Sequence, residues 1–395
     1  MSALATLASA ANPTAEDLFN DQILQDIRLT IEPEAWKTLQ DNYLLDDYYS
    51  VTFRWGNITV EKVGIRSRGS GSRNSSKPGL KVDFNQFVSG QKFLGLKSIV
   101  LDNLVQDPSM MAERLSMAVF RRLGIAAPRE AHARLYINEM YAGLYTVVEP
   151  VDKTFVVRSH NEDTGQLYDY EWSFDYRFEN MGPEIGNYAP VPFTPKTNED
   201  DPDPALAQLI VAANEANDFE FLEAISAYLD PIAFLDYLAV ETFVADIDGI
   251  LGDWGMNNFY LYQRKGTTLL SFIPWDKDVT FLQTDRSIWE NSRTNVLVMR
   301  LLDVPSLRDH YLRALQRCID TAEGPGGWLD QEVNRIEEQI RMAALEDTVK
   351  PSEHPAFSDS VLNIRNFVAN RPNSISSQIF DGRTSGMRAG AASSR

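Results

Sequence analysis

The chain has few of the residues that build cross-links and metal sites. It contains one cysteine, Cys318, so no internal disulfide can form and a disulfide-stapled scaffold is excluded. It contains four histidines, which are scattered along the sequence and form no HExxH motif or paired spacing: His132, His160, His310 and His354. We therefore do not expect a zinc site built on histidine.

Long apolar runs and excess positive charge are also missing. No stretch approaches the roughly 18 consecutive apolar residues of a membrane span, so no spanning helix is expected. The net charge of −19 argues against a general affinity for nucleic acid or anionic membranes, and solubility is its simplest role. The opening MSALATLASAANPTAEDLF lacks a basic n-region, so it predicts a flexible N-terminus over 1–20 rather than an intact secretion signal.

What remains is the composition of a globular protein with a β-rich first part. Over 395 residues, 44% are hydrophobic, enough for a sizeable core. Apolar and polar residues alternate over much of 21–150, with hairpin turns expected at 56–57 and 138–139. One helix interrupts the strands, predicted to start at Asp107-Pro108 and to end at Gly124.

The character of the sequence changes after residue 151, and helical periodicity dominates from residue 204 to 382. An aromatic, acidic and proline-rich stretch near 170–204 predicts a long loop, and a two-strand hairpin is inserted between helices near 258–276. The Gly/Ser/Arg-rich segment 383–395 is expected to be disordered. The chain is thus predicted to be α+β and bilobal, with a β-rich N-lobe (21–150) and a mostly helical C-lobe (151–382).

The inserted hairpin carries the strongest chemical signal. An apolar helix leads to Asp248, a glycine-rich loop follows, and Asn258 opens the first strand, while the returning strand ends at Asp276 and Asp278. Phosphoryl transfer needs such a set, because an acid takes the proton of the acceptor hydroxyl while an Asn and an Asp hold Mg²⁺ on nucleotide phosphates. Each residue alone could equally cap a helix, make a turn or end a strand.

The base of such a reaction has two candidates. In protein kinases the catalytic aspartate precedes the metal-binding asparagine by five positions. Asp253 stands at that distance from Asn258, whereas Asp248 stands ten before it.

The stretch IRSRGSGSRNSSKPGLKVDF is the candidate phosphate-binding loop. Its glycines and hydroxyls could wrap phosphates through backbone N–H groups, and Arg68, Lys77 and Lys81 add positive charge. It lacks the third glycine of GxGxxG and the GK[ST] ending of a P-loop. A polar hairpin loop followed by an edge strand explains it equally well.

Two glutamates complete the candidate set. Glu113 lies in the first turn of the predicted 107–124 helix, where it could fix a phosphate-binding lysine or simply suit the helix dipole. Glu149 ends an apolar strand where the lobes would join, and could face an adenine edge or merely be solvated.

Together these stretches resemble the CotH family, named for a spore coat protein and regarded as atypical protein kinases. The resemblance rests on GIRSRGSGSRNSSKPGLKVDF, FLGLKSIVLDNLVQDPSMMAERLSMAVFRRLGIAAPR, LYINEMYAGLYTVVEPVD and DGILGDWGMNNFYLY…FIPWDKDVTF, in that order, and covers roughly residues 15–380. It implies a divergent, bilobal protein-kinase-like fold that binds ATP with Mg²⁺ or Mn²⁺ and phosphorylates Ser or Thr of a protein. It also implies a secreted or cell-envelope protein.

The resemblance implies a role for each candidate. Lys77, with Lys81 as the alternative, would contact phosphate, and its helix partner would be Glu113. Glu149 would be the junction acid. The metal would be held by Asn258 and Asp276, with Asp278 an additional or outer ligand, and the Asp-Gly pair favours Asp248 as base while Asp253 stays open. Where such proteins often carry a lysine after LeuTyr, this chain has Asp169.

Two other functions remain open on the sequence alone. The fold could serve only as a surface or coat scaffold with adhesin-like binding, because fold does not guarantee activity. The site could also transfer AMP or glutamate instead of phosphate onto protein.

Overall fold

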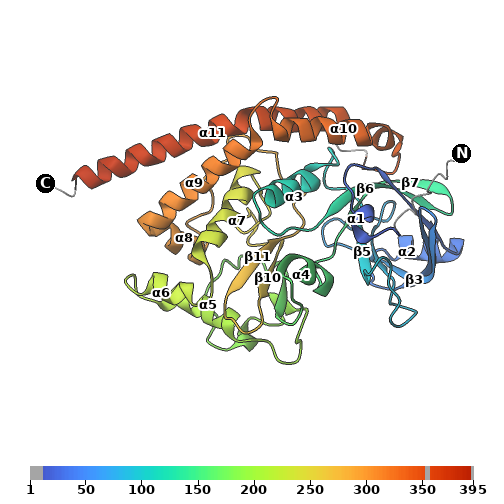
Figure 1. Cartoon of the computed structure of the whole chain (residues 1–395), viewed down its shortest axis with the longest axis horizontal. Coiled ribbons are helices and arrows are strands. Elements are labelled where there is room, and N and C mark those ends of the chain that lie inside the picture. Colours follow the sequence, from blue (N-terminus) through green and yellow to red (C-terminus); the bar gives the residue numbers. More distant parts are fainter. Residues whose placement is uncertain (1–11, 352–355, 393–395) are drawn as a thin grey trace, which may run out of the picture. The chain divides into compact units, whose positions relative to one another are not determined.

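The computed structural model describes residues 12–351 and 356–392, with side chains described as far as residue 380. The chain is α+β and forms two compact units (Figure 1). Unit 1 comprises the described residues up to Asn103 together with Arg129–Pro150 and Glu346–Lys350. Unit 2 comprises Leu104–Pro128, Val151–Leu345 and the described residues from Pro351 onward.

Unit 1 is a closed, mixed β-barrel. Its strand order is β1-β2-β3-β4-β5-β7-β6, and the parallel pairing of β6 with β1 closes it, all other pairs being antiparallel. The strands are β1 (Gln25–Thr30), β2 (Tyr49–Trp55), β3 (Ile58–Arg68), β4 (Gly79–Asp83), β5 (Ser98–Asp102), β6 (Glu130–Ile137) and β7 (Met140–Val148), with the short helices α1 (Ala15–Leu18) and α2 (Pro33–Asp41).

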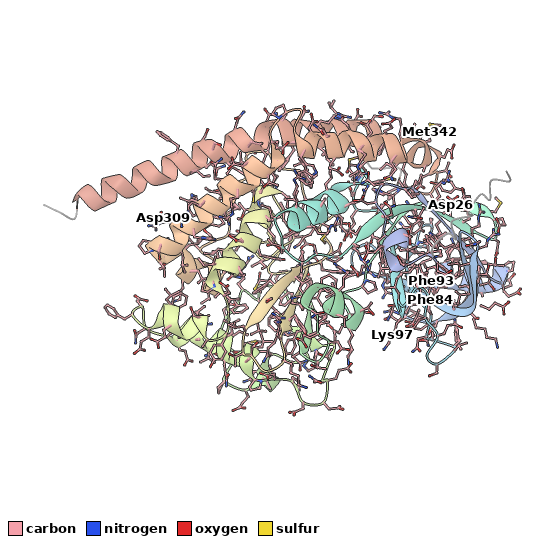
Figure 2. All side chains as sticks on the ribbon, in the orientation of Figure 1. Asp26, Phe84, Phe93, Lys97, Asp309 and Met342 are labelled. Atoms are coloured by element: carbon pink, nitrogen blue, oxygen red, sulfur yellow. The ribbon has the colours of Figure 1, made fainter. Side chains whose placement is uncertain are left out.

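Alternation of apolar residues fills the barrel, as the period of two requires. Three buried phenylalanines meet inside it, with ring centroids 5.2 Å apart for Phe53 and Phe84 and 5.1 Å apart for Phe84 and Phe93 (Figure 2). Both predicted hairpin turns are confirmed. Asn138 and Glu139, between β6 and β7, both have positive φ, at 50° and 64°, as a tight two-residue hairpin turn requires.

Unit 2 combines a small antiparallel sheet with the long helices. The sheet order is β11-β10-β8-β9, with β8 (Gln166–Tyr170), β9 (Phe193–Pro195), β10 (Phe259–Gln263) and β11 (Leu270–Pro274). The helices are α3 (Ala112–Arg122), α4 (Lys153–His160), η1 (Ile185–Asn187), α5 (Ala205–Glu215), α6 (Phe221–Ser226), α7 (Pro231–Phe243), α8 (Val296–Asp303), α9 (Pro305–Ala322), α10 (Trp328–Glu346) and α11 (Phe357–Ala392).

The helix expected inside the β-rich lobe belongs to unit 2 instead. Its apolar face packs on α7, where the rings of Phe120 and Tyr237 lie 5.2 Å apart. The helix also begins later than predicted, at Ala112 rather than at Asp107-Pro108. The Asp107 carboxylate still accepts the backbone N–H of Met111 and of Ala112 at 2.7 Å each. It therefore provides hydrogen-bond acceptors for N–H groups at the start of the helix, four and five positions further along the chain.

The two ends of the chain also differ from the prediction. Of the segment 1–20 expected to be flexible, residues 1–11 lie outside the described residues, and α1 lies within the remainder. Helix α11 continues to Ala392, through most of the segment 383–395 expected to be disordered, and 393–395 lie outside the described residues. Once a helix is established, each further residue that becomes ordered adds one backbone hydrogen bond. The helix formed by the preceding residues can therefore extend into this segment.

Of the helices described, none is both long enough and apolar enough to cross a membrane.

Candidate functional site

The predicted metal ligands lie at the same end of the β10–β11 hairpin. The register pairs Phe259 with Pro274, and the N–H of Trp275 donates to the carbonyl oxygen of Asn258 at 3.2 Å. Asp276 follows Trp275 directly. Asn258 and Asp276 both adopt left-handed backbone conformations, with φ of 60° and 51°, which Asn and Asp tolerate better than other side chains.

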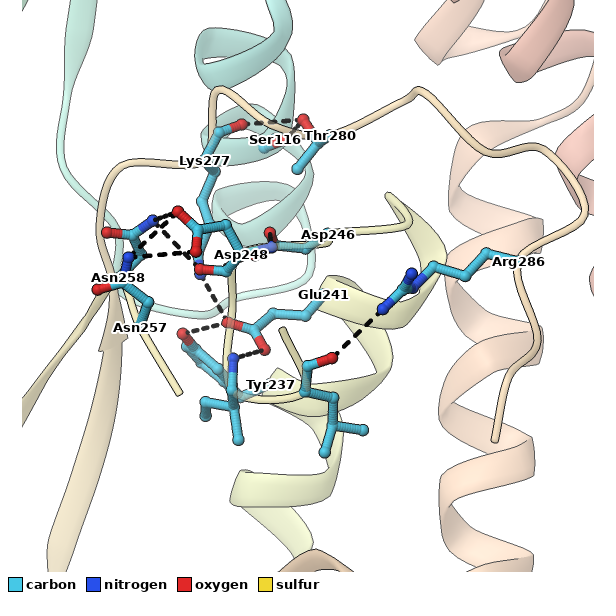
Figure 3. Close-up of polar contacts among 12 residues, drawn as sticks. Ser116, Tyr237, Glu241, Asp246, Asp248, Asn257, Asn258, Lys277, Thr280 and Arg286 are labelled. Atoms are coloured by element: carbon cyan, nitrogen blue, oxygen red, sulfur yellow. Dashed lines mark hydrogen bonds and ion pairs between the residues drawn. The ribbon is translucent and has the colours of Figure 1, made fainter. Parts of the chain in front are cut away.

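Asp248 lies in direct contact with this hairpin end. Its Oδ2 accepts hydrogen bonds from Asn258 Nδ2 at 2.9 Å and from Asn257 Nδ2 at 3.1 Å (Figure 3). Asn258 Nδ2 also donates to the Asp248 carbonyl oxygen at 3.1 Å. Because the amide nitrogen of Asn258 is committed to Asp248, its Oδ1 is the atom left to act as a ligand. Burial raises the pKa of Asp248, and the hydrogen bond from Asn257 offsets part of that rise.

The alternative base, Asp253, has different neighbours. Its carboxylate pairs with Arg286, with Asp253 Oδ1 2.6 Å from Arg286 Nη2, and accepts Asn291 Nδ2 at 3.1 Å. Its backbone N–H closes the loop by donating to the Ile247 carbonyl at 2.8 Å. Asp253 therefore braces the loop in which Asp248 lies, while the side-chain amides of Asn257 and Asn258 donate to Asp248.

A buried cluster of opposite charges connects the loop that carries Asp248 to helix α7. The ammonium of Lys277 lies 2.7 Å from Glu241 Oε1 and 2.8 Å from Asp246 Oδ2, and Lys277 has no solvent exposure (Figure 3). Glu241 comes from α7 and also accepts the Tyr237 hydroxyl at 2.8 Å and the Ile250 N–H at 3.0 Å. One lysine of the hairpin end thus joins the last turn of α7 to the loop that carries Asp248.

The electrostatics of this cluster favour a charged lysine. Burial alone would lower the pKa of Lys277, but the Asp246 and Glu241 carboxylates outweigh it and hold that pKa above its ordinary value. Burial raises the pKa of Glu241, and Lys277 opposes the rise. Two carboxylates against one ammonium give the cluster one formal negative charge.

Gly249 is required by the same packing. A Cβ added there would lie 2.5 Å from Asp246 Oδ2 and 2.8 Å from Glu241 Oε2. The Asp248-Gly249 pair noted in the sequence therefore has a structural cause, since only glycine leaves room for both buried carboxylates.

Helix α3 reaches the same turn. Ser116 Oγ lies 2.9 Å from Thr280 Oγ1, which donates to the Lys277 carbonyl at 2.9 Å. Glu113 lies in the first turn of α3, as predicted, and is buried. Asp276 and Asp278 flank Lys277 and are half-buried, so they are more accessible than the lysine between them.

Acidic, histidine and cysteine side chains do not by themselves form a metal site in the part of the chain that the structure describes. Among these residues, no group of three or more His, Cys, Asp or Glu is placed to hold a metal ion. Asn258 and Asp276 would supply a smaller donor set, of one amide oxygen and one carboxylate. Such a set suits Mg²⁺, which usually takes one or two carboxylates and completes its shell with substrate phosphates and water.

Lys77, predicted to contact phosphate, is sealed in a buried ion pair within unit 1. Its ammonium lies 2.6 Å from Asp347 Oδ2, and neither side chain has any exposure. The same oxygen accepts the Leu144 N–H at 3.0 Å, and burial lowers the pKa of Lys77. Gly143 makes room for the pair, because a Cβ there would lie 2.8 Å from Asp347 Oδ2 and 3.0 Å from Lys77 Cε.

The other predicted cations are more open. Arg68 Nη1 lies 3.7 Å from Asp102 Oδ2, with 19% of its side chain exposed. Lys81 Nζ lies 3.8 Å from Asp83 Oδ2, with 36% exposed.

Glu149 is not a solvated strand end. It is buried, and its carboxylate lies 2.6 Å from Arg129 Nη2. The solvated alternative is therefore wrong, because a buried carboxylate needs the partner that Arg129 provides. Asp169, which stands where a lysine was expected, lies 3.2 Å from Lys196 Nζ, so another segment brings a cation to that position.

The sequence reasoning missed the charges that hold the site together, which are Glu241, Asp246 and Lys277. It also missed Asp347, the partner of Lys77 in unit 1. Glu241 had a usable signal, since it is a charged residue within the apolar run LDYLAVETFVADI. Asp347 had none, because it lies 270 positions from Lys77 along the chain.

We expect the Lys77–Asp347 pair to be essential for the stability of unit 1. Asp347→Ala leaves a buried ammonium unpaired and should lower the free energy of unfolding by about 3–5 kcal/mol, measured by urea denaturation. Lys77→Met with Asp347→Asn should recover part of that loss. Asp83→Ala, at the open Lys81 pair, is the matched control and should cost about 1 kcal/mol or less; equal costs at the two pairs would contradict this assignment.

The Lys277 cluster yields a second stability prediction. Lys277→Met leaves Glu241 and Asp246 as facing buried carboxylates and should lower the free energy of unfolding by about 3–5 kcal/mol. Lys265→Met, at an exposed lysine on the β10–β11 turn, is the control and should change it by about 0.5 kcal/mol or less. Thermal and urea unfolding of both variants check this, and a Lys277 variant as stable as its control would show that the cluster is not structural.

Comparison with known proteins agrees with this arrangement of motifs. The family model described as CotH kinase protein matches residues 65–375. The inner spore coat protein H of Bacillus subtilis (strain 168) is 24% identical over 362 residues, covering 89% of this chain and 96% of that protein.

Among solved structures, the Shewanella oneidensis MR-1 complex of HipA, HipB and operator DNA contains a similar chain. The TM-score is 0.37 at 11% identity, over 73% of this chain and 61% of that one, so the chain spans about three fifths of that relative's length. A score this low carries no argument about the fold. The family assignment rests on the sequence match, and the chain belongs to the CotH kinase protein family.

Proposed function

We propose that this protein is an ATP-dependent protein kinase that transfers the γ-phosphate of ATP to Ser or Thr of a protein, with Mg²⁺ or Mn²⁺. The proposal rests on membership of the CotH kinase protein family and, above all, on one contact, between the Asp248 carboxylate and the Asn258 amide at 2.9 Å. This contact joins an acid able to take a proton to an amide able to bind a cation. Asp276 continues the same hairpin end.

The donor set fits a metal–nucleotide complex. Asn258 Oδ1 and the Asp276 carboxylate would hold the ion, and Asp278 would be an additional or outer ligand. Once bound, the ion would neutralise charge on the β- and γ-phosphates. The residues of the chain would do the rest by holding the acceptor hydroxyl in line with the γ-phosphorus.

Asp248 is the better candidate for the base. As the hydroxyl oxygen forms its bond to phosphorus and the bond to ADP breaks, the hydroxyl proton would pass to the Asp248 carboxylate. Asp253 would first have to leave its ion pair with Arg286. We therefore assign Asp253 a positioning role in the loop.

Arg68 and Lys81 would be the cations that contact phosphate in unit 1, because the side chain of each is partly exposed, at 19% and 36%. Lys77 could contact phosphate only if Asp347 moved away from it, because Asp347 Oδ2 already lies 2.6 Å from the Lys77 ammonium. In the proposed kinase Glu113 would be the acid that fixes the phosphate-binding cation, and Glu149 the acid at the junction of two lobes.

The proposed enzyme would have a divergent, bilobal kinase-like fold and would work in the cell envelope, in a spore coat or outside the cell. The support for this location is the name of the Bacillus subtilis relative, an inner spore coat protein. No basic surface for nucleic acid is expected at a net charge of −19.

The direct test is phosphate transfer by the purified full chain. With ATP and Mn²⁺ or Mg²⁺, intact-mass analysis of the chain and of added casein should show addition of phosphate. Addition of AMP or of glutamate would replace the kinase assignment by that transfer. If neither transfer nor nucleotide binding occurs, the protein is a scaffold, and the proposal is wrong.

We expect Asp276→Asn to abolish phosphate transfer. Loss of a metal ligand should lower kcat by about 10³-fold or more, because positioning and charge neutralisation supply most of the rate. Asp285→Asn, at an exposed acid outside the site, is the control and should retain full activity. Circular dichroism of both variants checks folding, and an active Asp276→Asn enzyme would contradict the metal assignment.

The two candidate bases can be separated directly. Asp248→Asn should lower kcat by about 10²–10⁴-fold, with a much smaller change in the KM for ATP. Asp253→Asn keeps a hydrogen-bonding side chain beside Arg286 and should lower kcat by less than about tenfold. The opposite ranking would make Asp253 the base.

A further inference from the structure

Arg371 is a buried cation that the proposed mechanism does not use. It lies on α11, and its side chain has no solvent exposure. Burial lowers the pKa of Arg371 to about 10, so the guanidinium remains charged at neutral pH. A buried charge is costly unless hydrogen bonds replace the water that it loses. The partners of this guanidinium therefore show which part of the structure it stabilises.

The guanidinium donates to four backbone carbonyl oxygens in two separate segments. Its Nη2 donates to the Thr242 carbonyl at 2.6 Å and its Nε to the Phe243 carbonyl at 3.2 Å. Its Nη1 donates to the Thr284 carbonyl at 3.0 Å and to the Arg286 carbonyl at 2.6 Å. The N–H groups of an arginine form a rigid planar fork, so one side chain can join both segments, whereas a lysine ammonium is a single point of donation.

The first segment is the last turn of α7. Carbonyl oxygens at the C-terminal end of a helix lack an N–H partner within the helix, and the helix dipole places negative potential there. Arg371 supplies both hydrogen-bond donors and a positive charge at this end. Asp248 follows Phe243 by five residues, so this contact fixes the point from which the loop with the proposed base begins.

The second segment holds the same loop further along the chain. The Arg286 guanidinium lies 2.6 Å from Asp253 Oδ1 and donates to the Leu251 carbonyl at 3.3 Å (Figure 3). Because Arg371 binds the backbone carbonyl of Arg286, it fixes the residue that holds Asp253. A single side chain of α11 thus connects both attachments of the loop that carries Asp248.

Gln378, two helical turns after Arg371 on α11, holds the second segment as well. Its Oε1 accepts the backbone N–H of Ile288 at 2.8 Å, and its Nε2 lies 3.4 Å from the Arg286 carbonyl oxygen. Seven residues bring two side chains to the same face of a helix, so one face of α11 carries both contacts. The segment is therefore held by α11 at two positions, and Arg371 also joins it to α7.

We propose that Arg371 is a positioning residue for phosphoryl transfer, and that through it α11 sets the place of the Asp248 carboxylate. The proposal rests on the proposed kinase function and adds a requirement to it. Arg371 would act through α7 and Arg286 and not on the substrate. Its four hydrogen bonds go to other segments than the hairpin end with Asn258 and Asp276, so binding of the metal–nucleotide complex should not depend on it.

Steady-state kinetics of Arg371→Lys in the full chain, with ATP, Mn²⁺ and casein, test the proposal. We expect kcat to fall about 10²-fold, because a displaced base loses its alignment with the acceptor hydroxyl. The KM for ATP should change less than about threefold, which places the loss in the chemical step and not in nucleotide binding. Arg365→Lys, the same substitution on the same helix at an arginine paired with Glu337 on α10, is the matched control and should keep full activity. Both variants are assayed well below their melting temperatures, so that the folded fraction is the same.

Hydrogen exchange supplies a readout that is independent of turnover. In Arg371→Lys the amides of residues 247–253 should exchange at least about tenfold faster, while those of β10 and β11 should be unchanged. A change spread evenly over unit 2 would show a general structural role and overturn the proposal, as would an unchanged kcat.

Gln378→Leu decides the question where Arg371→Lys does not fold, because it removes a single acceptor at a half-buried position. A kcat lowered about fivefold, with the KM for ATP unchanged, supports the proposal. An unchanged kcat in this variant overturns it.

The outcome is separable from that of the kinase proposal. An unaltered chain that transfers no phosphate overturns both proposals. An unaltered chain that is active, with Arg371→Lys as active as Arg365→Lys, overturns only the positioning role of Arg371.

Discussion

The buried ammonium of Lys277 is the interaction on which the described site depends. It lies within 2.8 Å of carboxylates from the end of α7 and from the loop that follows it. Because both acids would be costly to bury without it, the lysine forces the hairpin end and the Asp248 loop together. Asp276 and Asp278, its neighbours in the sequence, are placed by the same constraint, and Gly249 is needed so that the two carboxylates can fit.

The same physical device recurs in unit 1 with a different consequence. Lys77 and Asp347 form a fully buried pair that draws residues 346–350 into the barrel unit, although they follow the long α10 of unit 2 in the chain. A pair so enclosed is suited to fixing structure. In both units a fully buried lysine pairs with buried carboxylates and connects segments that are distant in the sequence.

The sequence predicted those features that short stretches control. Alternating residues and the turns at 56–57 and 138–139 gave the barrel strands, and the order of Asp248, Asn258 and Asp276 around a hairpin gave the core of the candidate site. The five-residue spacing from Asn258 favoured Asp253 but carried no information about Arg286, 33 positions away, which pairs with that carboxylate. The Asp107-Pro108 signal marked the approach to α3 but not its first residue, because the cap acts across four and five positions through a side chain.

Contacts between residues that are far apart in the sequence could not be predicted from the patterns of short stretches. Asp347 meets Lys77 across 270 positions, and α3 joins unit 2 because its apolar face matches α7, a choice that helical periodicity alone cannot make. Arg371 likewise meets the carbonyl oxygen of Phe243 across 128 positions.

The most direct test of the central claim is a crystal structure with Mn²⁺ and a non-hydrolysable ATP analogue, using the anomalous signal of manganese. We expect a manganese peak within coordination distance of Asn258 Oδ1 and the Asp276 carboxylate, with the triphosphate on its open side and Asp248 facing the γ-phosphate. Manganese and nucleotide bound away from these two side chains, with Asn258 and Asp276 in contact only with protein, would contradict it.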